Sequence, residues 1–174
     1  MPVGMIHGRF QPFHNGHLEY LRRSAERCEA IVVGITNPDR SLTRVEVADV
    51  HRSSDEANPW GYLERYRMVR GVLSTEGLED APVVPFPISD PALWSSYAPP
   101  EATHFLRVFD DWGREKASRL RGAGYAVEEL AAPAGKQVSG HEVRARLRSG
   151  GDWRSLVPPV VAEVIDAEAL RRSA

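Results

Sequence analysis

The sequence lacks the features that mark disulfide-rich, membrane-bound or exported proteins. Its 174 residues include a single cysteine, Cys28, which excludes an internal disulfide and a cysteine-based zinc site. No apolar run approaches the ~20 residues that a membrane-spanning helix needs. The opening stretch 1–6 is too short for a secretory signal and has no basic region. We therefore expect a cytoplasmic protein.

A strong net charge is also missing. Lys and Arg total 22 and Asp and Glu total 24, which gives a formal charge of −2. A near-neutral surface does not attract nucleic acids or anionic membranes, so we expect neither as a partner. Internal repeats and long Pro/Gly/Ser linkers are absent as well. The length then fits one domain that spans residues 1–174.

What the sequence contains is a regular alternation of strand and helix patterns. Apolar and β-branched runs predict strands at 3–7, 31–35, 83–86, 104–109 and 125–130. Helical spacing and capping residues predict helices from about 16, over 63–73 and 114–121, and over about 139–148 and 159–169. This order predicts an α/β fold, a single Rossmann-like domain with a five-stranded parallel sheet flanked by helices. Ligands of such sheets bind beyond the carboxyl ends of the strands.

The stretch 37–58 departs from this alternation. It has little periodicity and carries many charged side chains. A loop of this length inside a compact domain is usually functional or disordered. We interpret it as a substrate-loop insertion, in which Arg44 and Arg52 are candidates to bind an acceptor.

A ten-residue motif, Gly-Arg-Phe-Gln-Pro-Phe-His-Asn-Gly-His, follows the first strand at 8–17. His14 and His17 are three residues apart, where the loop turns into a helix whose N-terminus favours phosphate oxygens. Gly16 lets the backbone approach a ligand, and Arg9 adds positive charge. Two imidazoles placed there could stabilise the charge that builds on a phosphate during transfer. Two such histidines can also be structural, whereas a metal site finds no third ligand at a persuasive spacing.

A second motif, Ser-Gly-His-Glu-Val-Arg, begins at Ser139. Ser139 and Glu142 have the spacing of a capping box, so a second helix N-terminus is expected to face the first. Arg144 would project from the opening turns of that helix toward the β- and γ-phosphates, and Lys136 could join it. The alternative for Arg144 is an ordinary solvated helix face.

Together the two motifs resemble the nucleotidyltransferase superfamily that shares its HxGH motif with class I aminoacyl-tRNA synthetases. In detail the chain is similar to the archaeal-type nicotinamide mononucleotide (NMN) adenylyltransferases over nearly its whole length. The resemblance implies transfer of a nucleotide from an NTP to a phosphate or phosphonate acceptor with release of pyrophosphate. It implies Mg²⁺ held mainly by the nucleotide phosphates, with no protein metal ligands, and it leaves a homo-oligomer open.

The resemblance also assigns residues. The catalytic set is His14, His17, Arg9 and Arg144. The nucleotide and phosphate contacts it implies are Gly8, Phe10, Gly16, Lys136, Ser139, Gly140 and His141.

Several positions depart from the NMN-enzyme pattern. His141 replaces a Thr of the second motif, and Ala57 stands where the family has a phosphate-contacting Arg. Pro91 replaces an Asn that precedes the nicotinamide-stacking Trp, although Trp94 itself remains as an acceptor candidate. A site that reads a carboxamide loses affinity when the reading group is removed. The departures therefore predict retained chemistry with a different acceptor.

The segment Asp110-Asp111-Trp112 is similar to the Gly-Asp-Asp-Trp segment of glycerol-phosphate-type cytidylyltransferases. Its carboxylates could accept from the amine of cytosine or position a substrate, and we expect Asp110, Asp111 and Trp112 to bind the nucleotide. We therefore expect CTP-dependent transfer to a small phosphonate such as phosphonoformate, as in phosphonate natural-product biosynthesis. An ATP-dependent NMN adenylyltransferase and a non-catalytic nucleotide sensor remain as alternatives, and the near-neutral charge disfavours a tRNA-synthetase fragment.

Overall fold

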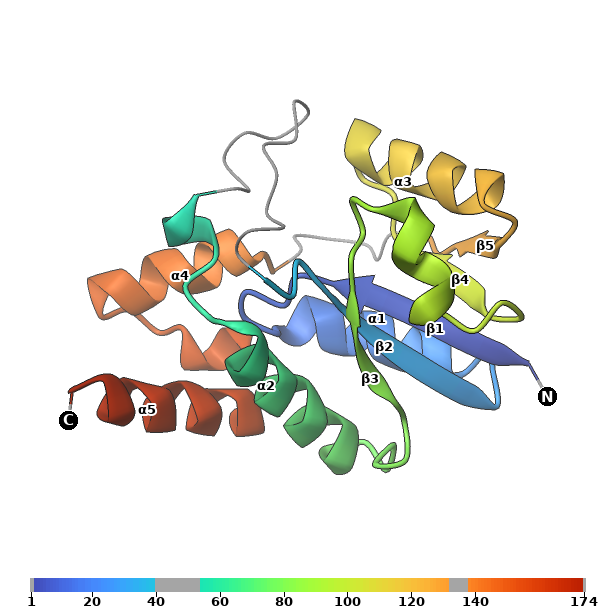
Figure 1. The fold of residues 1–174 in the computed structure, drawn as a ribbon. Helices are drawn as coiled ribbons and strands as arrows, with labels where there is room; N and C mark the ends of the chain where they lie inside the picture. Colours follow the sequence, from blue (N-terminus) through green and yellow to red (C-terminus); the bar gives the residue numbers. More distant parts are fainter. Residues whose placement is uncertain (1, 40–53, 132–137, 174) are drawn as a thin grey trace.

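The computed structural model describes residues 2–39, 54–131 and 138–173, and five parallel strands form its sheet (Figure 1). The strands are β1 (Val3–Gly8), β2 (Ala30–Thr36), β3 (Val83–Phe86), β4 (Thr103–Leu106) and β5 (Ala126–Glu129). The α-helices are α1 (Asn15–Ala25), α2 (Tyr62–Thr75), α3 (Asp111–Gly122), α4 (Gly140–Ser149) and α5 (Pro159–Ser173). The 3₁₀ turns are η3 (Asp55–Ala57), η4 (Pro91–Ser96) and η5 (Arg154–Leu156). The predicted fold class and element order are confirmed.

The two faces of the sheet are covered by different elements. Ile6 and Val33 point into a core built with α1, α2, α4 and α5, whereas Met5 and Val32 point into a core built with η4 and α3. Alternate residues of one strand thus enter opposite cores, which is why β2 is apolar without interruption from Ala30 to Ile35. Helices α2 and α5 lie side by side on one flank, and α3 lies on the other (Figure 1).

The fourth strand is shorter than predicted, because it ends at Leu106 rather than at Phe109. Its pairing with β5 stops at Leu106 and Glu129, so the residues beyond have no ladder to join. Helix α3 in turn begins at Asp111, three residues earlier than predicted, because the side chain of Asp110 accepts a hydrogen bond from the Gly113 amide.

The strand order β3-β2-β1-β4-β5 places the change of winding direction between β1 and β4. Parallel α/β sheets bind ligands at the carboxyl ends of the strands beside such a switch point. The first motif leaves β1 at this end. No helix in the described parts of the chain is long and apolar enough to cross a membrane.

Candidate active site

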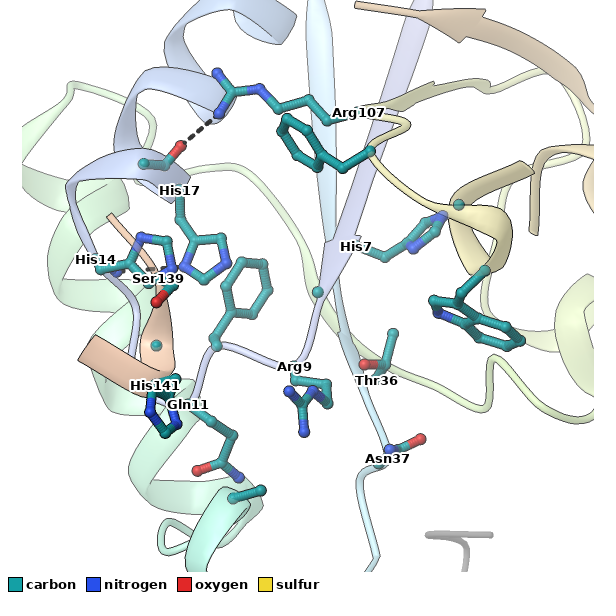
Figure 2. Close-up of a pocket in the computed structure, with 18 of the residues that line it drawn as sticks. His7, Arg9, Gln11, His14, His17, Thr36, Asn37, Arg107, Ser139 and His141 are labelled. Carbon is teal, nitrogen blue, oxygen red and sulfur yellow. Dashed lines mark hydrogen bonds between the residues drawn. The ribbon is translucent and has the colours of Figure 1, made fainter. Parts of the chain in front are cut away.

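A cavity of about 840 Å³ opens at the switch point (Figure 2). Its walls come from six parts of the chain: the end of β1 with the first motif, the end of β2, the segment 54–57, the residues 88–89 after β3, the loop from β4 into α3, and the start of α4. The predicted residues that line it are Gly8, Arg9, Phe10, His14, Gly16, His17, Asp110, Trp112, Ser139, Gly140, His141 and Arg144. Two motifs more than a hundred residues apart therefore share one site.

His14 and His17 sit at the N-terminus of α1 with their rings stacked, 3.7 Å between centroids. His14 is the N-cap, and its carbonyl accepts from the amides of His17 and Leu18 at 2.8 and 3.0 Å. The rings of Phe10 and Phe13 pack against His17 and hold it from the side. The spacing of three residues thus creates one paired imidazole surface at a helix N-terminus, where the helix dipole favours an anion.

The hydrogen bonds of His17 select its tautomer. Its Nδ1 accepts from the backbone amide of His14 at 3.3 Å. A neutral imidazole that accepts at one nitrogen carries its proton on the other. His17 therefore presents Nε2–H as a donor, which suits an oxygen whose negative charge grows during a reaction.

Both motif histidines are held neutral. Burial lowers the pKa of His14 to about 4, assisted by the charges of Arg107 and Arg144. Burial, His14 and the nearby Arg107 and Arg9 lower the pKa of His17 well below its ordinary value. The same arginines that disfavour imidazolium raise the positive potential of the site. The positive charge of the site is thus carried by guanidinium groups, while the two imidazoles are neutral.

The second motif packs directly on the first. Ser139 caps α4 by accepting from the Glu142 amide at 3.2 Å, as predicted. A side chain at Gly140 would collide with the Gln11 carbonyl, since an added Cβ would lie 2.7 Å from that oxygen. Arg144 is buried and donates to the same carbonyl. Arg144 therefore braces the first-motif loop while it lines the cavity, and the alternative of a solvated helix face is wrong.

Backbone carbonyls at the site are tied together by an arginine of α2. Arg65 is 3% exposed and donates to the carbonyls of Arg9, Thr36 and Asn37 at 2.7–2.9 Å. Burial lowers the pKa of Arg65 to about 10, so it stays charged at neutral pH. This guanidinium fixes the loop after β1 to the end of β2.

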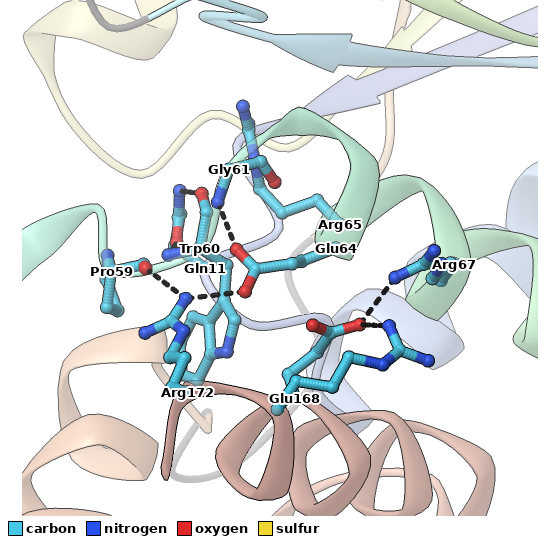
Figure 3. A network of polar contacts seen from close by, with 10 residues as sticks. Gln11, Pro59, Trp60, Gly61, Glu64, Arg65, Arg67, Glu168 and Arg172 are labelled. Atoms are coloured by element: carbon cyan, nitrogen blue, oxygen red, sulfur yellow. Dashed lines mark hydrogen bonds and ion pairs between the residues drawn. The ribbon is translucent and has the colours of Figure 1, made fainter. Parts of the chain in front are cut away.

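The first motif is also anchored to the start of α2. The side chain of Gln11 donates to the Trp60 carbonyl at 2.8 Å and accepts from the Trp60 amide at 3.1 Å, and Glu64 binds the Gly61 amide and Arg172 (Figure 3). These contacts join the motif to α2 and α5 through paired hydrogen bonds. These hydrogen bonds therefore fix the first-motif loop against the rest of the protein.

Two further cations stand at opposite margins of the site. Arg9 donates to the Asn58 side chain at 3.4 Å. Arg107 forms an ion pair with Glu19 and donates to the Gly16 carbonyl at 2.9 Å (Figure 2). Arg107 thereby holds the first turn of α1 while it lines the cavity.

Other predicted site residues lie elsewhere. Trp94 is 1% exposed in the core, where its Nε1–H donates to the Pro87 carbonyl at 2.9 Å, and it does not line the cavity. Asp111 is largely exposed and pairs with Arg114, outside the cavity lining. The positions of Arg44, Arg52 and Lys136 lie outside the described residues.

The structure adds site residues that sequence reasoning did not single out. His7 and Arg107 line the cavity, and Arg65 binds the backbone behind it. His7 stands at the carboxyl end of a predicted strand, which was the available signal, whereas Arg107 lay inside the strand predicted at 104–109 and follows β4 only in the structure. Arg65 lies inside a helical pattern, and nothing local distinguishes it from its neighbours.

A metal site built from protein side chains is not found among residues 2–39, 54–131 and 138–173. No group of three or more His, Cys, Asp or Glu there could hold an ion. The lining supplies mainly guanidinium, imidazole and helix-terminal N–H groups, all of which suit phosphate oxygens.

Comparison with known proteins agrees with this geometry. The chain is 48% identical to a phosphonoformate cytidylyltransferase of Streptomyces viridochromogenes, over 94% of this chain and 90% of that one. It is 32% identical to a nicotinamide-nucleotide adenylyltransferase of Picrophilus torridus, over 92% and 88% of the two chains. Its fold is similar to that of a bifunctional NMN adenylyltransferase/ADP-ribose pyrophosphatase from Francisella tularensis, with a TM-score of 0.59 at 14% identity. That alignment covers 99% of this chain and 57% of the bifunctional protein.

The family itself is shown by the match of residues 5–107 to the cytidylyltransferase-like family. This range contains β1, the first motif and the strands up to Arg107, which build most of the cavity wall. The chain belongs to the cytidylyltransferase-like family and is a nucleotidyltransferase.

Proposed function

We propose that this enzyme transfers CMP from CTP to a small phosphonate such as phosphonoformate and releases pyrophosphate. The observation that carries this proposal is the 48% identity to a phosphonoformate cytidylyltransferase, which extends over nearly the whole of both chains. The burial of Trp94 supports it, because the ring that would stack on nicotinamide in an NMN enzyme packs inside the core.

The residues at the cavity suit an in-line displacement at the α-phosphorus. An acceptor oxygen forms the new bond to that phosphorus, and the bond to the bridging oxygen of the β-phosphate breaks. The electron pair leaves with pyrophosphate. A phosphonate oxygen is already anionic near neutral pH, so no general base has to remove a proton. Positioning and charge stabilisation then account for most of the catalysis.

Each group has a definable task in this reaction. His17 donates from Nε2 to a non-bridging oxygen of the α-phosphate, and His14 stacks against it at the helix N-terminus. Arg144, Arg9 and the amides at the start of α4 face the β- and γ-phosphates and hold the leaving pyrophosphate. The side chain of His141, at the start of α4, is exposed and lines the same wall.

Mg²⁺ fits this site as an ion carried by the nucleotide, because the described lining offers nitrogen donors rather than a cluster of carboxylates. When bound, the ion would neutralise charge on the triphosphate. The guanidinium, imidazole and amide groups of the lining would bind and orient the phosphates.

We place the nucleobase and the acceptor against the other walls of the cavity. Asp110 lines the cavity and caps α3, so its carboxylate is the candidate to accept from the amine of cytosine. The two described ends of the segment 37–58 contribute Asn37, Ser54, Glu56 and Ala57 to the lining. We propose that the segment as a whole, with Arg44 and Arg52, is the acceptor loop. CTP and small phosphonates are cytoplasmic metabolites, so we propose that the enzyme acts in the cytoplasm.

An NMN adenylyltransferase is the second candidate, favoured by the 32% identity to the Picrophilus torridus enzyme. Pyrophosphate release should be measured with CTP and ATP, each crossed with phosphonoformate and NMN. We expect CTP with phosphonoformate to give the highest kcat/KM. Efficient NAD formation from ATP and NMN, without turnover of the phosphonate, would replace the proposal with the second candidate.

A further inference from the structure

A buried histidine lines the cavity outside the two motifs. His7 is at the end of β1, immediately before the first motif, and its side chain is on the η4 and α3 face of the sheet with Met5. It is 4% exposed, and its ring lies 5.1 Å from Phe86 and 5.6 Å from His104 between centroids. His7 is thus a buried polar group that packs between an aromatic ring and a second histidine.

Neither ring nitrogen of His7 has a hydrogen-bond partner among the residues that the structure describes. Buried polar groups are nearly always paired, because an unpaired one loses its hydration without compensation. Most other polar groups at the site are paired in this way: Gln11 with Trp60, Arg65 with three carbonyls, and Asp110 with an amide. His7 therefore resembles His14, whose Nδ1 also has no partner among the described residues, in being open to a group that enters the cavity.

The surroundings of His7 define the chemistry of that partner. Ser89, Trp112 and Lys116 line the cavity with it. Burial, with the charge of Lys116 as the next cause, lowers the pKa of His7 well below its ordinary value. His7 is therefore a neutral imidazole with one N–H to donate, beside a source of positive potential. Such a pair favours a small anionic oxygen group over a neutral carboxamide, because only the anion is attracted by the positive charge of Lys116.

The position of His7 separates it from the triphosphate. His14, His17 and Ser139 lie together on one side of the cavity, and His7 lies on the other, across the end of β1 (Figure 2). A group bound by His7 is thus separate from the phosphates that the motifs would hold.

We propose that His7 is a specificity-determining residue that donates a hydrogen bond to the second acidic group of the acceptor, the carboxylate of a carboxyphosphonate. This inference rests on the proposed function and deepens it. With the carboxylate held at His7, the phosphonate end of the acceptor is turned toward the α-phosphorus. The recognised class is a small phosphonate that carries a carboxylate, as opposed to a simple alkylphosphonate.

A matched pair of variants tests the proposal. His104 is also a buried histidine on this face whose ring nitrogens have no partner among the described residues, but it does not line the cavity. We expect His7→Phe to raise KM for phosphonoformate by about tenfold or more, and His104→Phe to change it by less than about twofold. KM for CTP should stay the same in both. His7→Gln, which keeps an N–H donor, should restore part of the affinity.

Two further measurements separate specificity from a structural defect. With methylphosphonate, which has no carboxylate, His7→Phe and the wild type should have similar kcat/KM values, and the thermal midpoint should fall by a similar amount in the two Phe variants. An unchanged KM for phosphonoformate in His7→Phe, or an equal loss with methylphosphonate, overturns the proposal.

Binding can be followed without turnover. In ¹⁵N-histidine NMR spectra of the wild type, assigned with His7→Phe, phosphonoformate should shift the His7 ring signals. Turnover of phosphonoformate without that shift refutes the role of His7 alone. A shift without turnover refutes the proposed function and leaves the binding role standing. Absence of both refutes both.

Discussion

The two sides of the cavity are built in different ways. The side to which we assign the phosphates, the phosphate side, comes from two contiguous motifs at two helix N-termini, and its groups brace one another, as Arg144 does with the Gln11 carbonyl. The side to which we assign the acceptor, the acceptor side, is assembled from single residues at the ends of separate strands and at the start of α3. It includes His7, a buried histidine with no partner among the described residues.

This difference follows from what each side must recognise. A triphosphate is the same in every reaction of the family, so a fixed constellation of donors serves all members. The acceptor differs between relatives that are named for NMN and for phosphonoformate. Single side chains at strand ends can change without disturbing the sheet below. The chemistry and the substrate are therefore encoded in separate parts of the molecule.

The largest effect is expected on the phosphate side. His17→Leu removes the Nε2–H donor and should lower kcat by about 10²–10³-fold, the range known for loss of one donor at a charged transition state. His17→Gln keeps an N–H near that position and should retain part of the rate. Single-turnover pyrophosphate release measures both. Equal activity of the two variants and the wild type would contradict a catalytic role of His17.

Arg65 connects the two sides of the cavity, so its removal should weaken substrate binding on both. Arg65→Met leaves three backbone carbonyls without their donor and should lower the free energy of unfolding by about 3 kcal/mol. KM for CTP and for the acceptor should rise together. Urea unfolding and steady-state kinetics test this, with Arg70→Met as the control. Arg70 is on the same helix and also donates to backbone carbonyls, but away from the cavity. A change in only one KM would show that the sides are independent.

The buried histidines predict a stability that depends on pH. The pKa of His14 and of His104 is lowered to about 4, and that of His7 and His17 is also lowered. The unfolded chain binds protons below about pH 6.5 while the folded chain does not, so stability is greatest above that pH. It should fall between pH 6.5 and 4, by up to about 1.4 kcal/mol per pH unit for each histidine.

Urea midpoints at pH 7.5, 6 and 5 measure this dependence. Bound CTP places negative charge beside His14 and His17 and should make the stability depend less on pH. His104→Phe should remove the part of the pH dependence that one histidine contributes. A midpoint that is constant over this range would show that the histidines are solvated.

The smallest effect concerns the two tryptophans near the acceptor side. Trp94→Phe should cost about 1 kcal/mol of stability through the lost bond to the Pro87 carbonyl, with little change in acceptor KM. Trp112→Phe should change acceptor KM more than stability, because Trp112 lines the cavity. Thermal melts and KM values for phosphonoformate compare them. A larger change in acceptor KM for Trp94→Phe than for Trp112→Phe would place Trp94 in the acceptor site.

Much of the site could be predicted because its residues are contiguous. The spacing of His14 and His17, the cap at Ser139 and the position of the motif after a strand are local properties, and they specify local geometry. Trp94 was expected at the site because the Trp of the family pattern remains although its neighbouring Asn is replaced, and the structure buries its ring. The end of β4 was misplaced because strand length depends on the partner strand, which local hydrophobicity does not describe.

The sequence by itself determined the order of strands and helices, the two motifs and the reaction they perform, because periodicity, capping and glycine placement act over a few residues. Only the tertiary structure decided that His7 and Arg107 line the cavity and that Arg65 secures it. These roles depend on which strand ends lie next to one another and on which polar groups become buried there. Such neighbours are created by packing across the sheet, between residues that are far apart along the chain.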